Sequence, residues 1–216
     1  ESRSEMMNFF PTLLLLVAIL AATSEAAAFY PSSSLSKATS TSLNMSGGAE
    51  DTPVVKEGDV LPSVVLQQGQ PDYSKPIDVD LRELLAKHNK VAIFAVPGAF
   101  TPGCSKSHLP SFIDAQDELK SKGVDLTICI ATNDAYVMEA WGRTSGGADG
   151  GIMFLSDGKD AELTRALGLS MGEGGVMVRS KRYSMIVDGK SGVVEKYFSA
   201  DESSENTWAP SVLSKL

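Results

Sequence analysis

The hydrophobic positions of this chain fall into two alternating patterns from about residue 52 onward. Short and nearly continuous apolar runs, typical of buried strands, cover residues 90–98, 124–134 and 151–158. Between them, apolar residues recur at helical spacing, as in the three leucines within 81–85. The helical segments predicted in this way are residues 78–90, 104–123, 135–144, 159–169 and a short one within 205–216.

Two further segments have the pattern of antiparallel hairpins. Residues 54–69 alternate and break at Gly and Pro, which predicts short strands paired in a hairpin. Residues 183–187 and 193–198 form a second predicted hairpin around a Gly-containing turn. Strands that alternate with helices imply parallel pairing, and the last hairpin adds antiparallel pairing. We therefore expect an α/β domain over 52–216, with a mixed β-sheet, helices on both faces and a thioredoxin-like fold as the leading candidate.

The first fifty residues have the composition of a targeting segment. Met6 or Met7 is taken as the start, and the apolar run that follows is shorter than the roughly 20 residues that span a bilayer. Its length suits a signal peptide with small residues at 26–28 for cleavage, so residues 1–28 are interpreted as leader and signal peptide. Residues 29–51 are rich in Ser and Thr, which is typical of a disordered transit segment.

The expected location follows from these segments. Ala28 followed by Phe29 resembles the junction in bipartite plastid presequences of algae with secondary plastids, so we expect a plastid. A secreted or endomembrane protein is the alternative, in which case Asn44 would begin a glycosylation sequon. The tripeptide 214–216, Ser-Lys-Leu, matches a peroxisomal address and gives a third alternative.

Charge and cysteine content narrow the classes of function. The formal charge of −8 argues against nucleic acid or an anionic membrane as a partner, because both require clustered Lys and Arg. The two cysteines, Cys104 and Cys129, are too few for a disulfide scaffold or a structural zinc site. Such a pair is often no more than two buried apolar residues. The sequence around each cysteine therefore has to indicate any chemistry.

Cys104 stands where a predicted strand passes through a stiff loop into a predicted helix. The segment VPGAFTPGCSKSHLP, residues 96–110, supplies Pro and Gly residues that bend this loop tightly. The free N–H groups and partial positive charge of a helix N-terminus favour a thiolate over a thiol. Thr101, three residues earlier, is placed to offer its hydroxyl near the sulfur. Because the thiolate is the nucleophilic form, this pattern predicts a reactive cysteine.

The same segment resembles the active-site segment of the peroxiredoxins, whose core is Pro-x-x-x-Thr-x-x-Cys. Pro97, Thr101 and Cys104 meet that spacing. The Gly-Ala-Phe before the Thr and the His-Leu-Pro after the Cys are similar to the type II, or Prx5-like, subgroup, from which Ser111 is a minor departure. The resemblance covers about residues 55–216 and implies a thioredoxin-like fold and a thiol peroxidase.

The resemblance also implies a role for each residue. The Cys104 thiolate would attack the O–O bond of a peroxide and become a sulfenic acid, while Pro97 shields the sulfur and Thr101 positions the peroxide. The segment RSKRYSMIVDG is similar to the one that supplies a stabilising arginine, which maps onto Arg182 and leaves Arg179 as a near competitor. A guanidinium suits this role because its fixed fork matches sulfur and peroxide oxygens in charge and geometry.

Cys129 has two interpretations. As a residue inside the predicted strand 124–134, it is simply small and apolar. Plant-type members of the subgroup hold a second cysteine at this spacing, which makes Cys129 a candidate resolving cysteine. The strand would then have to loosen, because a disulfide needs Cα atoms within about 7 Å. In the other case, glutathione or a glutaredoxin attacks the sulfenic acid.

We expect an antioxidant enzyme of redox homeostasis that reduces hydrogen peroxide and alkyl hydroperoxides. It would need no metal or other cofactor, only an external thiol reductant, which is glutathione with glutaredoxin or else thioredoxin. The alternative with the same residues is a peroxide sensor that relays a disulfide to a partner protein. A thioredoxin-like domain with inert thiols would instead show slow alkylation of Cys104 at mildly acidic pH. The subgroup often forms dimers beside the active-site loop, so a homodimer stays open for this chain.

Other residues are not assigned a role in the reaction. His108 could suggest a protease-like Cys–His pair or a metal ligand, but no third ligand or orienting acid accompanies it. The preferred interpretation is that His108 bonds locally to hold the loop. His88 is expected to be solvated, and Trp141 and Trp208 are expected to be packing anchors. The Gly-rich stretch 145–151 lacks the ending of a phosphate loop.

Overall fold

The computed structural model describes residues 54–171 and 177–216. The predicted signal peptide and transit-like segment lie outside the described residues. The strands are β1 (Val65–Gln68), β2 (Ile77–Asp80), β3 (Lys90–Ala95), β4 (Leu126–Ala131), β5 (Ile152–Ser156), β6 (Ser170–Met171), β7 (Arg179–Ser180), β8 (Tyr183–Asp188) and β9 (Val194–Ser199). In the described part of the chain, seven of them form one sheet in the order β2-β1-β5-β4-β3-β8-β9, and β6 pairs with β7. The neighbours β3, β4 and β5 are parallel, and the other pairs are antiparallel, so the expected mixed sheet is confirmed.

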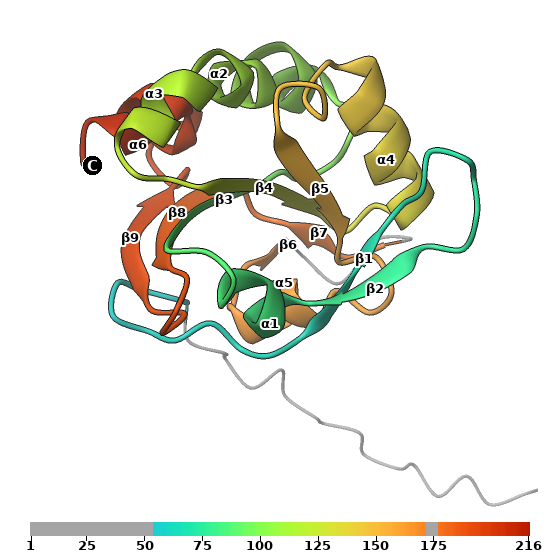
Figure 1. Ribbon diagram of the computed structural model, residues 1–216, viewed down its shortest axis with the longest axis horizontal. Helices are drawn as coiled ribbons and strands as arrows, with labels where there is room; N and C mark the ends of the chain where they lie inside the picture. Colours follow the sequence, from blue (N-terminus) through green and yellow to red (C-terminus); the bar gives the residue numbers. More distant parts are fainter. Residues whose placement is uncertain (1–53, 172–176) are drawn as a thin grey trace, which may run out of the picture. The chain divides into compact units, whose positions relative to one another are not determined.

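Helices cover both faces of this sheet, as expected. They are α1 (Leu81–Leu85), the π-helical turn η1 (Cys104–His108), α2 (Leu109–Asp114), α3 (Gln116–Ser121), α4 (Ala135–Thr144), α5 (Glu162–Ala166), the 3-10 turn η2 (Ser204–Thr207) and α6 (Ala209–Leu213). In Figure 1, α2, α3, α4 and α6 lie over one face, and α1 and α5 lie over the other. None of the described helices has the length and apolar character needed to cross a membrane.

The core consists of two hydrophobic clusters on opposite faces of the sheet. Successive side chains of a strand point to opposite faces. In β3, Val91 and Ile93 therefore pack in the cluster that α1 and α5 cover, while Ala92 and Phe94 pack in the cluster under α2, α4 and α6. Each large aliphatic side chain buried in this way contributes about 1.5–3 kcal/mol. Both cysteines belong to the second cluster.

The predicted hairpin within residues 54–69 is wrong. Strand β1 pairs instead with β2, which lies in the segment predicted to be helical at 78–90. The helix begins only at Leu81, because the Asp80 carboxylate accepts the backbone N–H of Glu83 at 2.9 Å and caps the first turn. The leucines that predicted the helix are buried in α1, so the periodic pattern was sound and its bounds were too wide.

The long segment 104–123 is helical, and the helix predicted to kink or restart at Pro110 restarts at Leu109, where α2 follows η1. The N–H of Leu109 bonds to the carbonyl of Cys104, which makes the first turn a π-helical turn. Pro110 lies in the first turn of α2. Backbone N–H groups in the first turn have no partner within the helix, so the missing N–H of proline costs no helical hydrogen bond. Gly123, with φ +87°, follows the end of α3 as expected. The predicted helix 135–144 is confirmed with the same bounds.

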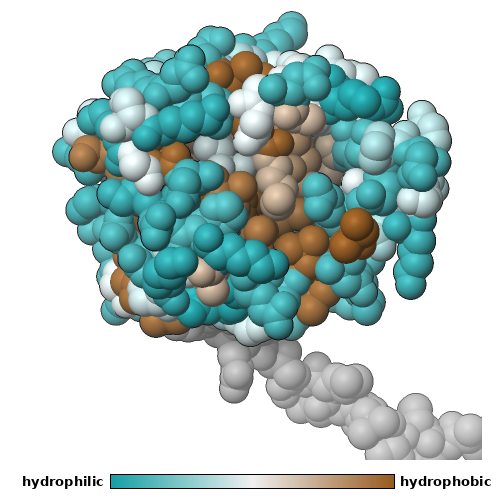
Figure 2. Space-filling view, in the orientation of Figure 1, coloured by the Kyte–Doolittle hydropathy of each residue, from teal (hydrophilic) through white to brown (hydrophobic). Residues whose placement is uncertain are grey.

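The face shown in Figure 2 is mostly hydrophilic, with hydrophobic residues gathered in a hollow over β5. This hollow has a volume of about 360 Å³, and its apolar lining includes Leu126, Ile152, Met153 and Phe154. None of the candidate site residues lines it.

The tripeptide 214–216 is folded onto the domain. The N–H of Lys215 bonds to Val212 and that of Leu216 to Leu213, so both continue the last turn after α6. The Leu216 side chain is partly buried against the second cluster.

Candidate active site

Cys104 lies at the start of a helical segment that follows the interior strand β3. The strand register continues past β3, because the N–H of Val96 donates to the carbonyl of Ile130 at 3.0 Å. The chain then turns and enters the helix, where the N–H of Ser105 bonds to the carbonyl of Thr101 at 2.9 Å. Cys104 is only 1% exposed. The sulfur is therefore held among apolar side chains beside the first turn of a helix.

Two side-chain bonds fix the loop before Cys104. The hydroxyl of Thr101 donates to the carbonyl of Gly98 at 2.8 Å. The N–H of Ala99 donates to the side-chain oxygen of Asn133 at 2.8 Å. Asn133 follows β4, the parallel neighbour of β3, and sequence reasoning missed it. The position of Asn133 after a predicted strand could have indicated it. The carboxyl ends of parallel strands meet at one edge of the sheet, so residues that follow β3 and β4 lie close together.

Arg182 contacts the sulfur. It immediately precedes β8, whose Tyr183 pairs with Ala95 at the end of β3. This antiparallel register places residues just before β8 beside residues just after β3. The Arg182 Nη2 group donates to Cys104 Sγ at 3.2 Å. A fixed positive charge at this distance favours a thiolate and any negative charge that develops next to it.

Arg179, the other candidate for the stabilising arginine, occupies a different position. Its Nη1 group donates to the carbonyl of Pro97 at 3.3 Å. It also lies over Gly98, where an added Cβ would be 2.8 Å from Nη1. Of the two arginines, Arg182 contacts the sulfur and Arg179 contacts the loop that covers it.

His108 holds Arg182 in place, and the predicted local bond is wrong. The Arg182 Nη1 group donates to His108 Nδ1 at 2.8 Å, so the opposite ring nitrogen, Nε2, carries the proton and donates to the carbonyl of Thr207 at 3.0 Å. Burial, followed by the charge of Arg182, lowers the pKa of His108 to about 3. The ring is therefore neutral near pH 7 and can accept from the guanidinium. The Ser184 hydroxyl also donates to Thr207, at 2.6 Å.

Cys129 lies in the middle of the sheet. It sits in β4 between Phe94 of β3 and Phe154 of β5, and none of its surface is exposed. Burial raises the pKa of the Cys129 thiol well above its ordinary value, and the neighbouring Cys104 raises it further. Both cysteines are free. In this conformation Cys129 is a buried residue of the apolar core.

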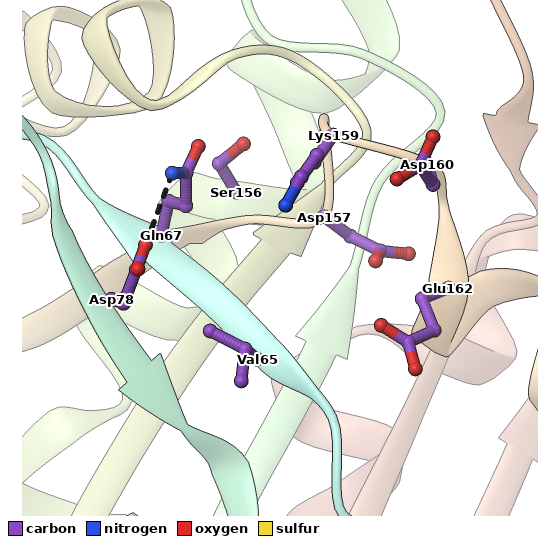
Figure 3. Close-up of a pocket in the computed structure, with 8 residues that line it drawn as sticks. All are labelled: Val65, Gln67, Asp78, Ser156, Asp157, Lys159, Asp160 and Glu162. Atoms are coloured by element: carbon purple, nitrogen blue, oxygen red, sulfur yellow. Dashed lines mark hydrogen bonds between the residues drawn. The ribbon is translucent and has the colours of Figure 1, made fainter.

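A separate cavity of about 100 Å³ lies between β1 and the loop after β5 (Figure 3). Gln67 donates to Asp78 at 3.1 Å on one side, and Asp157 and Lys159 line the cavity from the loop after β5 (Figure 3). No candidate site residue lines this cavity. Within residues 54–171 and 177–216, no three His, Cys, Asp or Glu side chains gather as a metal site would require.

Comparison with known proteins agrees with this geometry. The family profile described as Redoxin matches residues 56–213. The structure of reduced Prx3 from Vibrio vulnificus in complex with H₂O₂ is 41% identical, with a TM-score of 0.66, and the match covers 76% of this chain and all of that one. The chain belongs to the peroxiredoxin family. The predicted resemblance and the thioredoxin-like fold are thereby confirmed.

Further relatives support the type II subgroup within the peroxiredoxins. Rice chloroplastic Peroxiredoxin-2E-2 is 46% identical over 142 residues, which is 64% of this peroxiredoxin and 61% of the rice protein. The match thus spans about three fifths of that relative's length. Peroxiredoxin 5 from Alvinella pompejana is 28% identical with a TM-score of 0.60, over 75% of this chain and 99% of that one.

Proposed function

We propose that this peroxiredoxin is a thiol peroxidase that reduces hydrogen peroxide and alkyl hydroperoxides through a sulfenic acid at Cys104. The observation that carries the proposal is the guanidinium of Arg182, 3.2 Å from the sulfur of a buried cysteine at a helix start. The guanidinium favours the thiolate form of Cys104. It also stabilises the negative charge that passes from the sulfur to the peroxide during the attack. Family membership supports the same reaction class.

In the oxidation step, the Cys104 thiolate attacks one oxygen of the peroxide. The S–O bond forms as the O–O bond breaks, so sulfur loses two electrons and the peroxide gains them. The second oxygen leaves as an alkoxide or hydroxide and takes up a proton, giving an alcohol or water. Arg182 stabilises both the thiolate and the charge on the leaving oxygen.

Thr101 and Pro97 prepare the peroxide for this attack. The Thr101 hydroxyl donates its hydrogen bond to the carbonyl of Gly98. The lone pairs of the hydroxyl oxygen therefore remain available to accept a hydrogen bond from the O–H of the peroxide. Pro97 is half-buried in the loop before Cys104 and shields the sulfur from water. Arg179 holds that loop through the Pro97 carbonyl.

In the reduction step, an external thiol attacks the sulfenic acid, forms a disulfide with Cys104 and releases water. Glutathione with glutaredoxin and thioredoxin are the proposed reductants. The burial of Cys129 and its raised pKa favour an external thiol as the first attacking group. Cys129 would act as the resolving cysteine only if β4 loosens.

We propose a plastid as the site of action. The rice relative is named chloroplastic, and the transit-like composition of residues 29–51 supports the same compartment.

The test is the intact mass of the reduced full chain after one equivalent of hydrogen peroxide, with no added thiol. A gain of one oxygen on Cys104 supports the peroxidase and an external reductant. A loss of two hydrogens that disappears in Cys129→Ser supports the peroxidase with Cys129 as the resolving cysteine. No change within seconds contradicts the proposal. Mixed disulfides with proteins other than glutaredoxin or thioredoxin in extracts would favour the sensor.

A further inference from the structure

Trp141 belongs to the rigid layer beside the active site. It is 1% exposed, and its ring packs edge-on against Phe154 of β5, with centroids 5.8 Å apart at 83°. The next residue, Gly142, is so close to Phe154 that an added Cβ would lie 2.6 Å from the ring. Helix α4 is therefore packed tightly on β5, and the position of the indole is fixed by the sheet.

From this fixed position, Trp141 contacts the active-site segment on both sides of Cys104. Its indole Nε1–H donates to the hydroxyl of Ser105 at 3.1 Å. Its ring also lies 6.5 Å from the ring of Phe100, at 53°. One side chain of the rigid layer thus joins the loop before the cysteine to the helical turn after it.

The backbone at Phe100 is strained in this closed arrangement. Its φ of 59° is in the left-handed region, which is unfavourable for a residue other than glycine. Phe100 is 58% exposed, so its own burial offsets little of this strain. An opening of this segment would relieve the strain, whereas the contacts with Trp141 would oppose it.

The sulfur of Cys104 must become exposed before a protein thiol can reach it, because Cys104 is 1% exposed. We propose that Trp141 is a positioning residue whose bond to Ser105 keeps the active-site turn closed and sets the rate at which the Cys104 sulfenic acid meets its reductant. This inference rests on the proposed peroxidase function. The closed state favours reaction with peroxide, and the open state favours reaction with thiol.

The test measures two reactions of the Cys104 sulfenic acid, its reduction by a thiol and its further oxidation by peroxide. The full chain carries Cys129→Ser, so that no internal disulfide competes with either reaction. One equivalent of hydrogen peroxide forms the sulfenic acid, and dithiothreitol then reduces it with release of water. In a parallel sample, excess hydrogen peroxide converts it to sulfinic acid, also with release of water. Trp141→Phe and Ser105→Ala each remove the bond. Each should speed reduction about three- to tenfold, as expected for one net hydrogen bond, and lower the sulfinic acid yield.

The double variant and a control separate the bond from general loosening. Trp141→Phe with Ser105→Ala should match either single variant, since both changes remove the same bond. Tyr136→Phe, an exposed change on the same helix, should leave both reactions unchanged. Where Trp141→Phe fails to fold, Ser105→Ala alone carries the test.

Two failures are distinguishable. If the parent protein forms no sulfenic acid, the proposed peroxidase is wrong. If it forms the sulfenic acid but Ser105→Ala is reduced at the parent rate, or if the effects of the two changes multiply in the double variant, the role of the Trp141–Ser105 bond is wrong.

Discussion

The two cysteines share one hydrophobic cluster and differ in almost everything else. Both are free and at most 1% exposed, so burial does not distinguish them. Cys104 ends a bent loop at a helix start and receives a guanidinium at 3.2 Å. Cys129 is in the middle of a strand between two aromatic neighbours, and its thiol has a raised pKa. We therefore expect the charge partner and the local backbone to decide which of the two buried thiols reacts.

The largest expected effect comes from removing each thiol in turn. Cys104→Ser should abolish peroxide consumption, because a hydroxyl without a strong base is not a competent nucleophile. Cys129→Ser should keep the rate of the first oxidation. It should lower the free energy of unfolding by about 1–3 kcal/mol, because it places a hydroxyl in the apolar cluster. Stopped-flow peroxide consumption and denaturant unfolding measure the two effects. Equal losses of oxidation rate in both variants would contradict the distinction.

The next effect concerns the charge beside Cys104. Arg182→Lys should slow oxidation by roughly tenfold or more, because an ammonium group cannot donate to Cys104 and His108 from one fixed fork. Arg179→Lys is the matched control, since it changes a bond to the Pro97 carbonyl instead. The second-order rate of oxidation by hydrogen peroxide is the measurement. A larger loss for Arg179→Lys would transfer the role to that residue.

A third effect concerns the imidazole ring of His108, which holds Arg182. The pKa of His108 is about 3 in the folded protein and 6.5 ordinarily, so between these values the unfolded state binds more protons. The stabilisation from the neutral ring is complete above about pH 6.5 and is lost as the pH falls toward 3. The free energy of unfolding should therefore decrease from pH 7 to pH 4, and His108→Gln should flatten this decrease.

Denaturant unfolding at several pH values checks this dependence. His88→Gln, which changes the other histidine of the chain, separates the contribution of His108 from that of His88. An unchanged slope in His108→Gln would show that the ring is not neutral in the fold.

The errors in the predicted fold have one physical origin. Helix 135–144 was predicted with its bounds, because its apolar stripe lies within the segment and its cap, Asp134, directly precedes it. Strand β2 was assigned to a helix because its partner, β1, is supplied by another segment. Periodicity records which residues are buried, but it does not record which strand they pair with.

The sequence by itself determined the reactive segment, because the turn residues, the helix start and Cys104 are adjacent in the chain, and local backbone preferences act over that distance. It also indicated the strand that holds Cys129. The family resemblance named Arg182 as the partner of the sulfur, but only the tertiary structure shows that contact and the roles of His108 and Asn133. The register of β3 with β8 brings Arg182 to a cysteine 78 positions away, and His108 bonds to Thr207 across 99 positions. These contacts depend on how strands pair and helices pack, and no local pattern in the sequence encodes that pairing.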